Sequence, residues 1–177
     1  MALGCRKGAV TVTLDVDFLS VQELFSESGE FDDGACGLET LLSQSSYSPS
    51  IGSVQKFIED LIQSGSDSTE KRFFYVLRQA GQQRWLGLAQ LRLTDDLADL
   101  DFVIISESSR GAGLAKILLE NSLNEVRLAG AKRVLLEVGE SNFAAQALYN
   151  RFGFSTISVR KKYYKNGENA LIMELNF

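Results

Sequence analysis

Apolar residues follow two different periods along the chain, and the switches between them mark the predicted elements. Alternating apolar and polar positions predict strands, whereas apolar positions three and four apart predict amphipathic helices. The clearest helix runs over 113–129 and stops at Gly130, and a second over 142–152 has Ser141 or Asn142 as its N-cap. The apolar stripe of the first helix consists of Ala115, Leu118, Leu119, Leu123 and Val126. The predicted strands are 9–16, 72–79, 84–93, 97–106 and 132–138, with 154–164 and 169–177 as a closing hairpin around "KNGE".

The first half of the chain has fewer predicted strands and more helix and loop. Helices are expected at about 18–27, 37–44 and 53–64, and stretches rich in Gly, Ser and acidic residues predict loops over 28–52 and 64–70. The order of elements is therefore strand, helices, three strands, helix, strand, helix and two strands. It predicts one domain over 1–177 with an α/β (α+β) fold: a mixed, mostly antiparallel seven-stranded sheet containing a strand–helix–strand crossover.

Composition excludes several classes of function. The net charge is −5 over 177 residues and no long basic cluster is present, which argues against nucleic acid as a partner. No apolar run approaches the ~18 residues that a membrane span needs, and the N-terminus lacks the apolar core of an export signal, so we expect a cytoplasmic protein that does not enter a membrane. Cys5 and Cys36 lie in unlike surroundings and are expected to be a reduced pair.

The chain contains no histidine. A Ser-His-Asp or Cys-His mechanism is therefore excluded, as is a metal held by histidine. If the protein is an enzyme that needs a general base, the base is a carboxylate, a tyrosine, a lysine or water.

The stretch "SSRGAGLAKILL" (108–119) places two glycines where the 113–129 helix begins. The N–H groups of a first helical turn have no intrahelical partner, and the helix dipole adds partial positive charge there. Gly111 and Gly113 leave room for an anion against the backbone, and Arg110 adds a full charge. The spacing fits neither a Walker loop nor G-x-G-x-x-G. Pyrophosphate binding is one interpretation, and a turn that glycine eases between strand and helix is the alternative.

The residues from Arg110 to Ala115 fit the [Q/R]-x-x-G-x-[G/A] signature, and the chain here resembles the GNAT superfamily of acetyl-CoA-dependent N-acetyltransferases. The downstream segment "LLEVGESNFAAQALYNRFGF" (135–154) is most similar to the RimI-type ribosomal-protein-alanine N-acetyltransferases, and the tail "VRKKYYKNGENALIMEL" continues the resemblance. The similarity covers about 97–177. It departs from that pattern over 15–60, where an aromatic-proline "F-P-W-S"-like element is missing.

The resemblance implies a GNAT-like sheet in which strands 97–106 and 132–138 run parallel and splay apart. Acetyl-CoA, the cosubstrate, is expected in the gap between them, and no metal is implied. The backbone N–H groups of 103–105 are expected to stabilise the oxyanion. The residues implied to bind the coenzyme are Val103, Ile104 and Ile105 on the acyl-pantetheine arm, Arg110, Gly111, Ala112, Gly113, Leu114 and Ala115 on the pyrophosphate, and Asn142.

Because no cysteine occurs in the motif region, direct transfer between bound substrates is expected rather than an acetyl-enzyme. Strand alternation sets Glu137 on the face opposite Leu136, and the resemblance implies that Glu137 is the general base. An exposed surface glutamate is the alternative, with Glu140 as a weaker competitor for the role. The resemblance also places the hydroxyl of Tyr149 near the coenzyme sulfur as a general acid, although its helical spacing is equally typical of a core aromatic.

The acceptor is the least determined part of the prediction. The stretch "RKKYY" resembles the place where N-terminal acetyltransferases hold the first residues of a peptide, which makes Tyr163 and Tyr164 candidate substrate contacts. The leading hypothesis is a protein N-terminal α-amine, with ribosomal-protein alanine as the main case. The second is a small amine such as a polyamine, an amino acid or an aminoglycoside. The third is a module that binds acetyl-CoA without turnover or that needs a partner subunit.

Overall fold

In the computed structural model of the chain, the described residues are 3–7, 10–19, 41, 70–79 and 85–177. Most of the predicted helices and loops between 18 and 69 lie outside these residues. Within that region, Leu41 is helical and fully buried. The predicted helix 18–27 is wrong at its start, because its first two residues belong to a strand that ends at Leu19.

Within the described ranges, eight strands form one sheet in the order β1-β2-β3-β4-β5-β6-β8-β7. Every neighbouring pair is antiparallel except β5 and β6. The prediction of a mixed, mostly antiparallel sheet is therefore confirmed. The observed sheet has, among the described residues, one strand more than the seven predicted. The strands are β1 (Leu3–Lys7), β2 (Val10–Leu19), β3 (Glu70–Gln79), β4 (Trp85–Thr94), β5 (Leu97–Ile105), β6 (Arg133–Gly139), β7 (Ser155–Arg160) and β8 (Ala170–Asn176).

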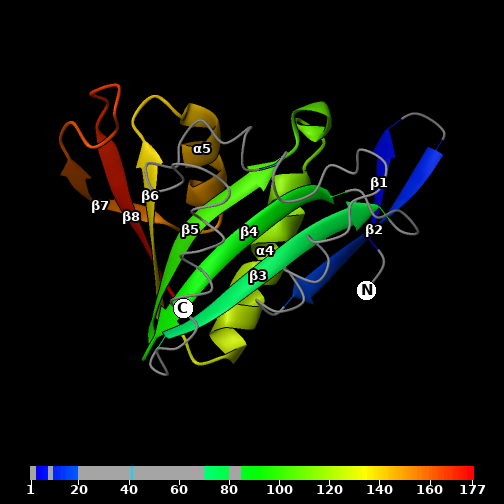
Figure 1. Cartoon of the computed structure of the whole chain (residues 1–177), viewed down its shortest axis with the longest axis horizontal. Helices are drawn as coiled ribbons and strands as arrows, with labels where there is room; N and C mark the ends of the chain where they lie inside the picture. The colour runs from blue at the N-terminus through cyan, green and yellow to red at the C-terminus, as the bar shows by residue number, and fades with distance from the viewer. Residues whose placement is uncertain (1–2, 8–9, 20–40, 42–69, 80–84) are drawn as a thin grey trace.

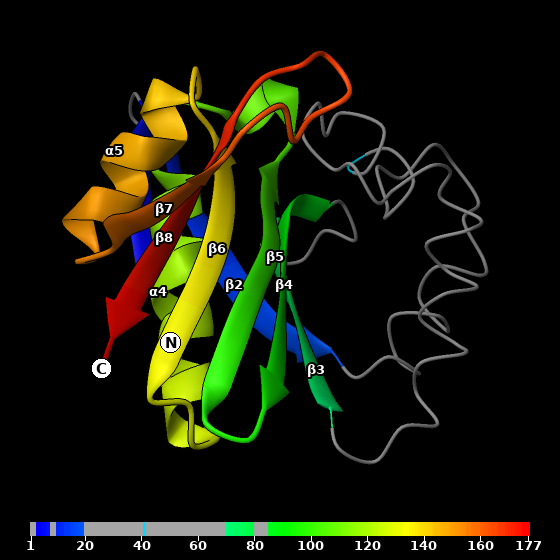
Figure 2. The same cartoon turned by 90° about the vertical axis from the view of Figure 1, so that its left-hand side faces the viewer.

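Helices α4 (Leu114–Leu128) and α5 (Phe143–Arg151) lie on the same side of the sheet (Figures 1 and 2). A short 3-10 helix, η1 (Glu107–Ser109), joins β5 to the entrance of α4. Helix α4 packs on β3, β4 and β5 through the stripe that the sequence predicts, although Ala115 is only half-buried. The side chains that are fully buried in this layer include Leu77, Ala89, Leu91, Leu118, Leu119, Val126 and Val134.

The two parallel strands pair over only part of their length. The β5–β6 pairing runs from Leu97 with Arg133 to Leu100 with Leu136 and ends there, while β6 continues to pair with β8 as far as Gly139. A β-bulge lies at the same level, because the β4–β5 register shifts and leaves Asp101 without a partner residue on β4. A bulge bends its strand and increases the local twist. The expected splay is therefore present, and it begins at the bulge.

The carboxylate of Asp101 fixes this bulge to β4. It accepts two hydrogen bonds from Arg92 Nε and one from Nη2, at 2.7 to 2.9 Å, and a further one from Gln90 Nε2 at 3.0 Å. Burial raises the pKa of Asp101, and Arg92 opposes the rise. Charge-assisted forked pairs of this kind hold geometry well, so the point at which β5 leaves β6 is rigidly set.

The β7–β8 connection is longer than the tight hairpin that "KNGE" predicts. It spans 161–169, so Tyr163 and Tyr164 lie in the connection and not in a strand. Lys162 adopts φ 52° and Gly167 adopts φ 82° within it. The connection is also tied to the loop between β6 and α5, because Glu168 accepts a hydrogen bond from the Ser141 N–H at 2.7 Å.

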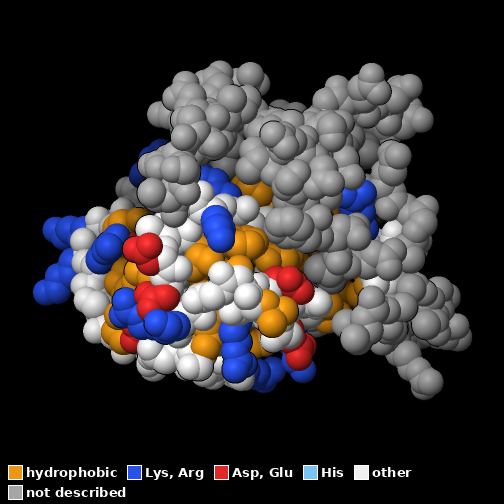
Figure 3. Space-filling view, turned by 90° about the horizontal axis from the view of Figure 1, so that it is seen from below, with side chains coloured by type: hydrophobic (Ala, Val, Ile, Leu, Met, Phe, Trp, Pro, Cys, Tyr) orange, Lys and Arg blue, Asp and Glu red, His pale blue; other side chains and the backbone are white. Residues whose placement is uncertain are grey.

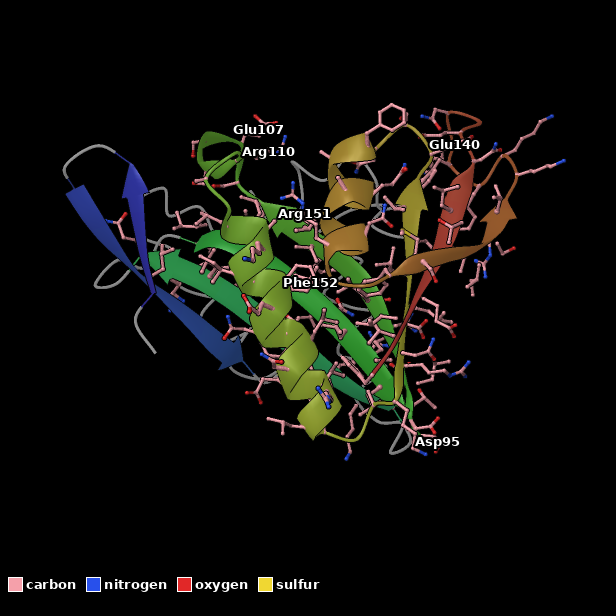
Figure 4. The ribbon with its side chains drawn as sticks, turned by 180° about the vertical axis from the view of Figure 1, so that it is seen from behind. Asp95, Glu107, Arg110, Glu140, Arg151 and Phe152 are labelled. Atoms are coloured by element: carbon pink, nitrogen blue, oxygen red, sulfur yellow. The ribbon has the colours of Figure 1, made fainter. Side chains whose placement is uncertain are left out.

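The lower end of the molecule carries the far end of α4 and the chain terminus. Leu128 is 80% exposed there, and the Arg127 guanidinium lies 5.7 Å from the centroid of the Phe177 ring. Figure 3 shows apolar side chains mixed with charged side chains of both signs at this end. Glu107, Arg110 and Glu140 lie at the opposite, upper end, where β5 and β6 have separated (Figure 4).

Candidate active site

The entrance of α4 is an open, glycine-lined turn. Gly111 and Gly113 have φ of 75° and 78°, and Gly113 is the N-cap without a capping side chain. A Cβ atom added at either glycine would meet no atom of the described residues within 4 Å, and the first turn of α4 contains no acidic residue. Leu114 is buried and anchors the turn, while Ala112 and Ala115 are half-buried. The arrangement presents the positive end of a helix to open space, as an anion site requires.

Arg110 is held close to this turn. Its Nε donates to the Ile105 carbonyl at 3.2 Å, and its Nη1 lies 3.8 Å from Glu107 Oε1. Its side chain is 53% exposed, so the guanidinium adds positive charge next to the glycines at the upper end of the molecule (Figure 4).

Along β5, the backbone N–H and C=O groups of successive residues point alternately toward β4 and away from it. The Ser106 N–H donates to the Leu86 carbonyl at 2.9 Å, which fixes the phase of the β4–β5 ladder. In an antiparallel ladder every second residue bonds across the pair, and the residues between point the other way. Ile104 therefore bonds toward β4, whereas Val103 and Ile105 present backbone groups to the gap beside β6. Of the three residues expected along the coenzyme arm, Val103 and Ile105 therefore turn backbone groups to this gap, and their contact with the coenzyme stays a prediction.

Glu137 lies on β6 just beyond the last residue paired with β5. Leu136 and Val138 point into the helix-covered core, so Glu137 is on the other face of the sheet, as alternation predicts. Its side chain is 30% exposed, and its Oε1 forms an ion pair with Arg160 Nη1. The competing carboxylate, Glu140, is exposed and accepts a hydrogen bond from Asn169 Nδ2 at 2.8 Å.

The two predicted acceptor tyrosines lie beside Glu137. A hydrogen bond to the Glu137 carboxylate is the main cause that raises the pKa of Tyr163. Tyr164 is 8% exposed, and burial, followed by the negative charge of Glu137, raises its pKa. The rings of Tyr163 and Tyr164 meet edge to face at a centroid distance of 5.2 Å. The structure therefore brings this pair and Glu137 together from distant parts of the sequence.

Tyr149 on α5 is a buried aromatic that retains a polar group. It is 8% exposed, its ring centroid lies 5.7 Å from that of Phe154, and burial raises its pKa to about 12. Tyr149 also contributes to the raised pKa of Tyr164, which places the two phenols near each other. Tyr149 is thus a core residue, as its helical spacing predicts, and it stays protonated at neutral pH.

Asn142 is the N-cap of α5, and its Oδ1 accepts a hydrogen bond from the Ala145 N–H at 3.2 Å. The capping role expected from the sequence is therefore observed, and the contact with the coenzyme stays a prediction. Within the described ranges, no group of three or more Cys, Asp or Glu side chains is arranged to hold a metal ion. None of the helices that are described is both long enough and apolar enough to span a membrane.

Two features of the site were not singled out from the sequence. Arg160 pairs with Glu137 across β8, 23 residues away along the chain. The only feature of the nearby sequence that points to a part for Arg160 in the site is its position in "RKKYY". The second is the Asp101 bulge. In the sequence it is marked only by the place where apolar and polar residues stop alternating in "LADLDFVII". Both depend on contacts between strands that local periodicity does not report.

Comparison with known proteins places this geometry in a family. A model of the acetyltransferase (GNAT) family matches residues 39–154. The ribosomal protein bS18-alanine N-acetyltransferase of Escherichia coli K12 is 33% identical over 113 residues, 62% of this chain and 75% of that protein.

Solved structures agree with this assignment. The crystal structure of the ribosomal-protein-S18-alanine N-acetyltransferase from Escherichia coli has a TM-score of 0.69 at 25% identity, covering 92% of this chain and 93% of that one. The NatC complex bound to Gag peptide and CoA shares the fold at 19% identity, with a TM-score of 0.68 and coverage of 93% and 98%. The chain belongs to the GNAT acetyltransferase family and is an N-acetyltransferase.

Proposed function

We propose that this enzyme transfers the acetyl group of acetyl-CoA directly to the N-terminal α-amine of a protein, with a ribosomal-protein alanine as the main case. One observation carries the proposal. Glu137 stands on β6 immediately beyond the point where β5 and β6 part, and it contacts Tyr163 from the β7–β8 connection. A carboxylate, an opening between strands and an aromatic pair are thus gathered in one place.

The entrance of α4 fits the diphosphate of the coenzyme. Among the residues that the structure describes, no atom lies within 4 Å of a Cβ built on Gly111 or Gly113, and the helix dipole favours negative charge at this end. Arg110 adds a cation, and the N–H groups of residues 111–115 would hold the phosphates. The outward-facing backbone groups of Val103 and Ile105 would bond the amides of the pantetheine arm. When bound there, the coenzyme supplies an activated thioester.

Three groups of the chain are assigned to the reaction. Glu137 accepts a proton from the incoming ammonium, directly or through water, and leaves a neutral amine as the nucleophile. The Tyr149 hydroxyl, whose pKa burial raises to about 12, is protonated at neutral pH and donates its proton to the departing thiolate. The N–H groups of β5 that face the gap stabilise the negative charge that develops on the acyl oxygen. Asn142 caps α5 and is proposed to contact the coenzyme as well.

The acceptor assignment rests on Tyr163 and Tyr164 together with the relative at 33% identity, which acts on the alanine of a ribosomal protein. An acceptor screen tests it. Thiol release from acetyl-CoA is measured with peptides that begin Ala-Arg, Met, Ser or Gly, and with polyamines and amino acids. A preference for an alanine peptide supports the proposal. Turnover on small amines alone replaces it with the small-amine alternative.

The base is tested by Glu137→Gln against Glu140→Gln, which makes the same change on a neighbouring exposed carboxylate. General-base catalysis contributes roughly 10²–10⁴-fold, so Glu137→Gln is expected to lower kcat by about 100-fold or more. The KM for acetyl-CoA should be kept, and Glu140→Gln should retain most of the activity. Unchanged turnover of Glu137→Gln at every pH rules out this base.

A further inference from the structure

The candidate base is already bound to a cation of the protein. Arg160 ends β7, and its Nη1 contacts Oε1 of Glu137. The sheet register explains the reach: Arg160 pairs with Ala170, which pairs with Gly139, two residues beyond Glu137 on the same face. The side chain of Arg160 therefore crosses β8 diagonally to meet the carboxylate.

The same guanidinium also touches the neighbouring tyrosine. The Arg160 Cζ lies 5.5 Å from the centroid of the Tyr163 ring, and the Tyr163 hydroxyl lies near enough to the Glu137 carboxylate for Glu137 to raise the pKa of Tyr163. The three side chains form a closed set in which each contacts the other two. Arg160 thus orients both the carboxylate and an aromatic that is proposed to hold the acceptor.

The ion pair between Arg160 and Glu137 can break, and another cation can take the place of Arg160, without unfolding of the protein. The Arg160 side chain is 57% exposed and that of Glu137 is 30% exposed. Exposed pairs contribute little to stability because water screens them. An acceptor ammonium that needs Glu137 Oε1 would compete with Arg160 for the same oxygen, and Arg160 has solvent to move into.

We propose that Arg160 is a positioning residue that holds the Glu137 carboxylate in alignment with Tyr163, and that yields its place on the carboxylate to the acceptor ammonium. This inference rests on the proposed function of Glu137. The acceptor nitrogen passes its proton to a Glu137 oxygen, and the neutral carboxyl loses its attraction for Arg160. The proton then leaves to solvent, and the ion pair forms again.

The charges around Glu137 predict shifts of the pH profile in opposite directions when a neighbouring cation or a neighbouring anion is removed. From the described elements that pack around it, Glu137 faces Arg160, Tyr163, Tyr164 and Asp99, and on β8 it pairs with Ile172. A neighbouring cation favours a carboxylate over its protonated form, and a neighbouring anion disfavours it. Removing Arg160 and removing the charge of Asp99 should therefore act in opposite directions.

The experiment measures kcat/KM for an alanine peptide against pH in the wild type and five variants, one of which is Glu137→Gln. Arg160→Gln should move the acidic limb of the profile up by about half a pH unit, the size expected for an exposed pair. Arg160→Lys should move it less because the charge is kept, and Asp99→Asn should move it down. Arg133→Gln, which removes an arginine paired with Glu174 at 3.2 Å elsewhere on the same face, changes the net charge equally and should leave the limb in place.

The acceptor KM separates positioning from direct binding. In Arg160→Gln it should stay the same or fall, because a competitor of the ammonium has gone. A limb that does not move, or an acceptor KM that rises tenfold, overturns the proposal. Glu137→Gln separates the proposed function of Glu137 from the proposed role of Arg160. If the acidic limb persists in that variant, Glu137 is not the base and the proposed function fails. If the limb vanishes there but is unmoved in Arg160→Gln, only the role of Arg160 fails.

Discussion

Replacing Gly113 by alanine is expected to weaken coenzyme binding far more than it weakens the fold. The backbone there has φ of 78°, and an added Cβ would meet nothing within 4 Å in the part of the chain that the structure describes. The folded state therefore suffers backbone strain without a clash, about 1–2 kcal/mol for a left-handed alanine. A smaller conformational entropy of the unfolded chain offsets roughly 0.4–1 kcal/mol of this. The net loss, of the order of 1 kcal/mol, corresponds to a Tm lower by about 2–4 °C.

The effect on the coenzyme has a different origin. The new methyl group occupies space that a phosphate needs and removes at least one charge-assisted N–H contact, worth about 1.5–3 kcal/mol. Affinity for coenzyme A should fall by about 10-fold to 100-fold. Titration calorimetry measures the Kd directly, and a smaller rise of Tm on adding coenzyme A provides an independent measure.

Gly130 provides the matched control at the opposite end of the same helix. It has φ of 111° and equally open surroundings, so Gly130→Ala strains the fold without touching the proposed phosphate site. Its Kd for coenzyme A should be that of the wild type. Wild-type affinity in Gly113→Ala would refute the reasoning, and so would an equal loss in Gly130→Ala, which would trace the effect to helix stability.

Two further predictions concern Tyr149 and Asp99. Tyr149→Phe should lower kcat by about 10-fold to 100-fold with the KM for acetyl-CoA kept, because the ring still fills the core while the proton donor is gone; equal rates of thiol release would remove Tyr149 from the chemistry. Burial raises the pKa of Asp99 in the folded state, so its contribution favours folding below the unfolded value of about 3.9 and is lost as the pH rises through the folded value. Asp99→Asn should therefore have a higher Tm than the wild type at pH 7, with the difference shrinking below about pH 4; melting curves with a difference that is constant with pH would contradict this.

The elements around the coenzyme site could be predicted because their signals are local. Helix α4 begins within one residue of its predicted start, since the glycines and the apolar stripe lie next to each other in the sequence. Alternation around Leu136 predicts the face of Glu137 correctly. The cap of α5 at Asn142 follows from the preference for a short polar side chain at that position.

The remaining features depend on contacts between distant strands. β1 is a short edge strand that pairs only with β2, and "LGCRK" carries no clear alternation to predict it. The widened β7–β8 connection follows from bonds of Glu168 to Ser141 and of Asn169 to Glu140, which lie on another loop. The pairing of Arg160 with Glu137 likewise arises only when β8 lies between β6 and β7 and pairs with both.

The most direct test of the central claim is a crystal structure of the protein with coenzyme A. We expect the diphosphate on the backbone N–H groups between Gly111 and Ala115, and the sulfur in the gap between β5 and β6 within hydrogen-bonding distance of the Tyr149 hydroxyl. Coenzyme bound at any other place, or β5 and β6 paired beyond Leu100 so that no gap exists, would contradict it.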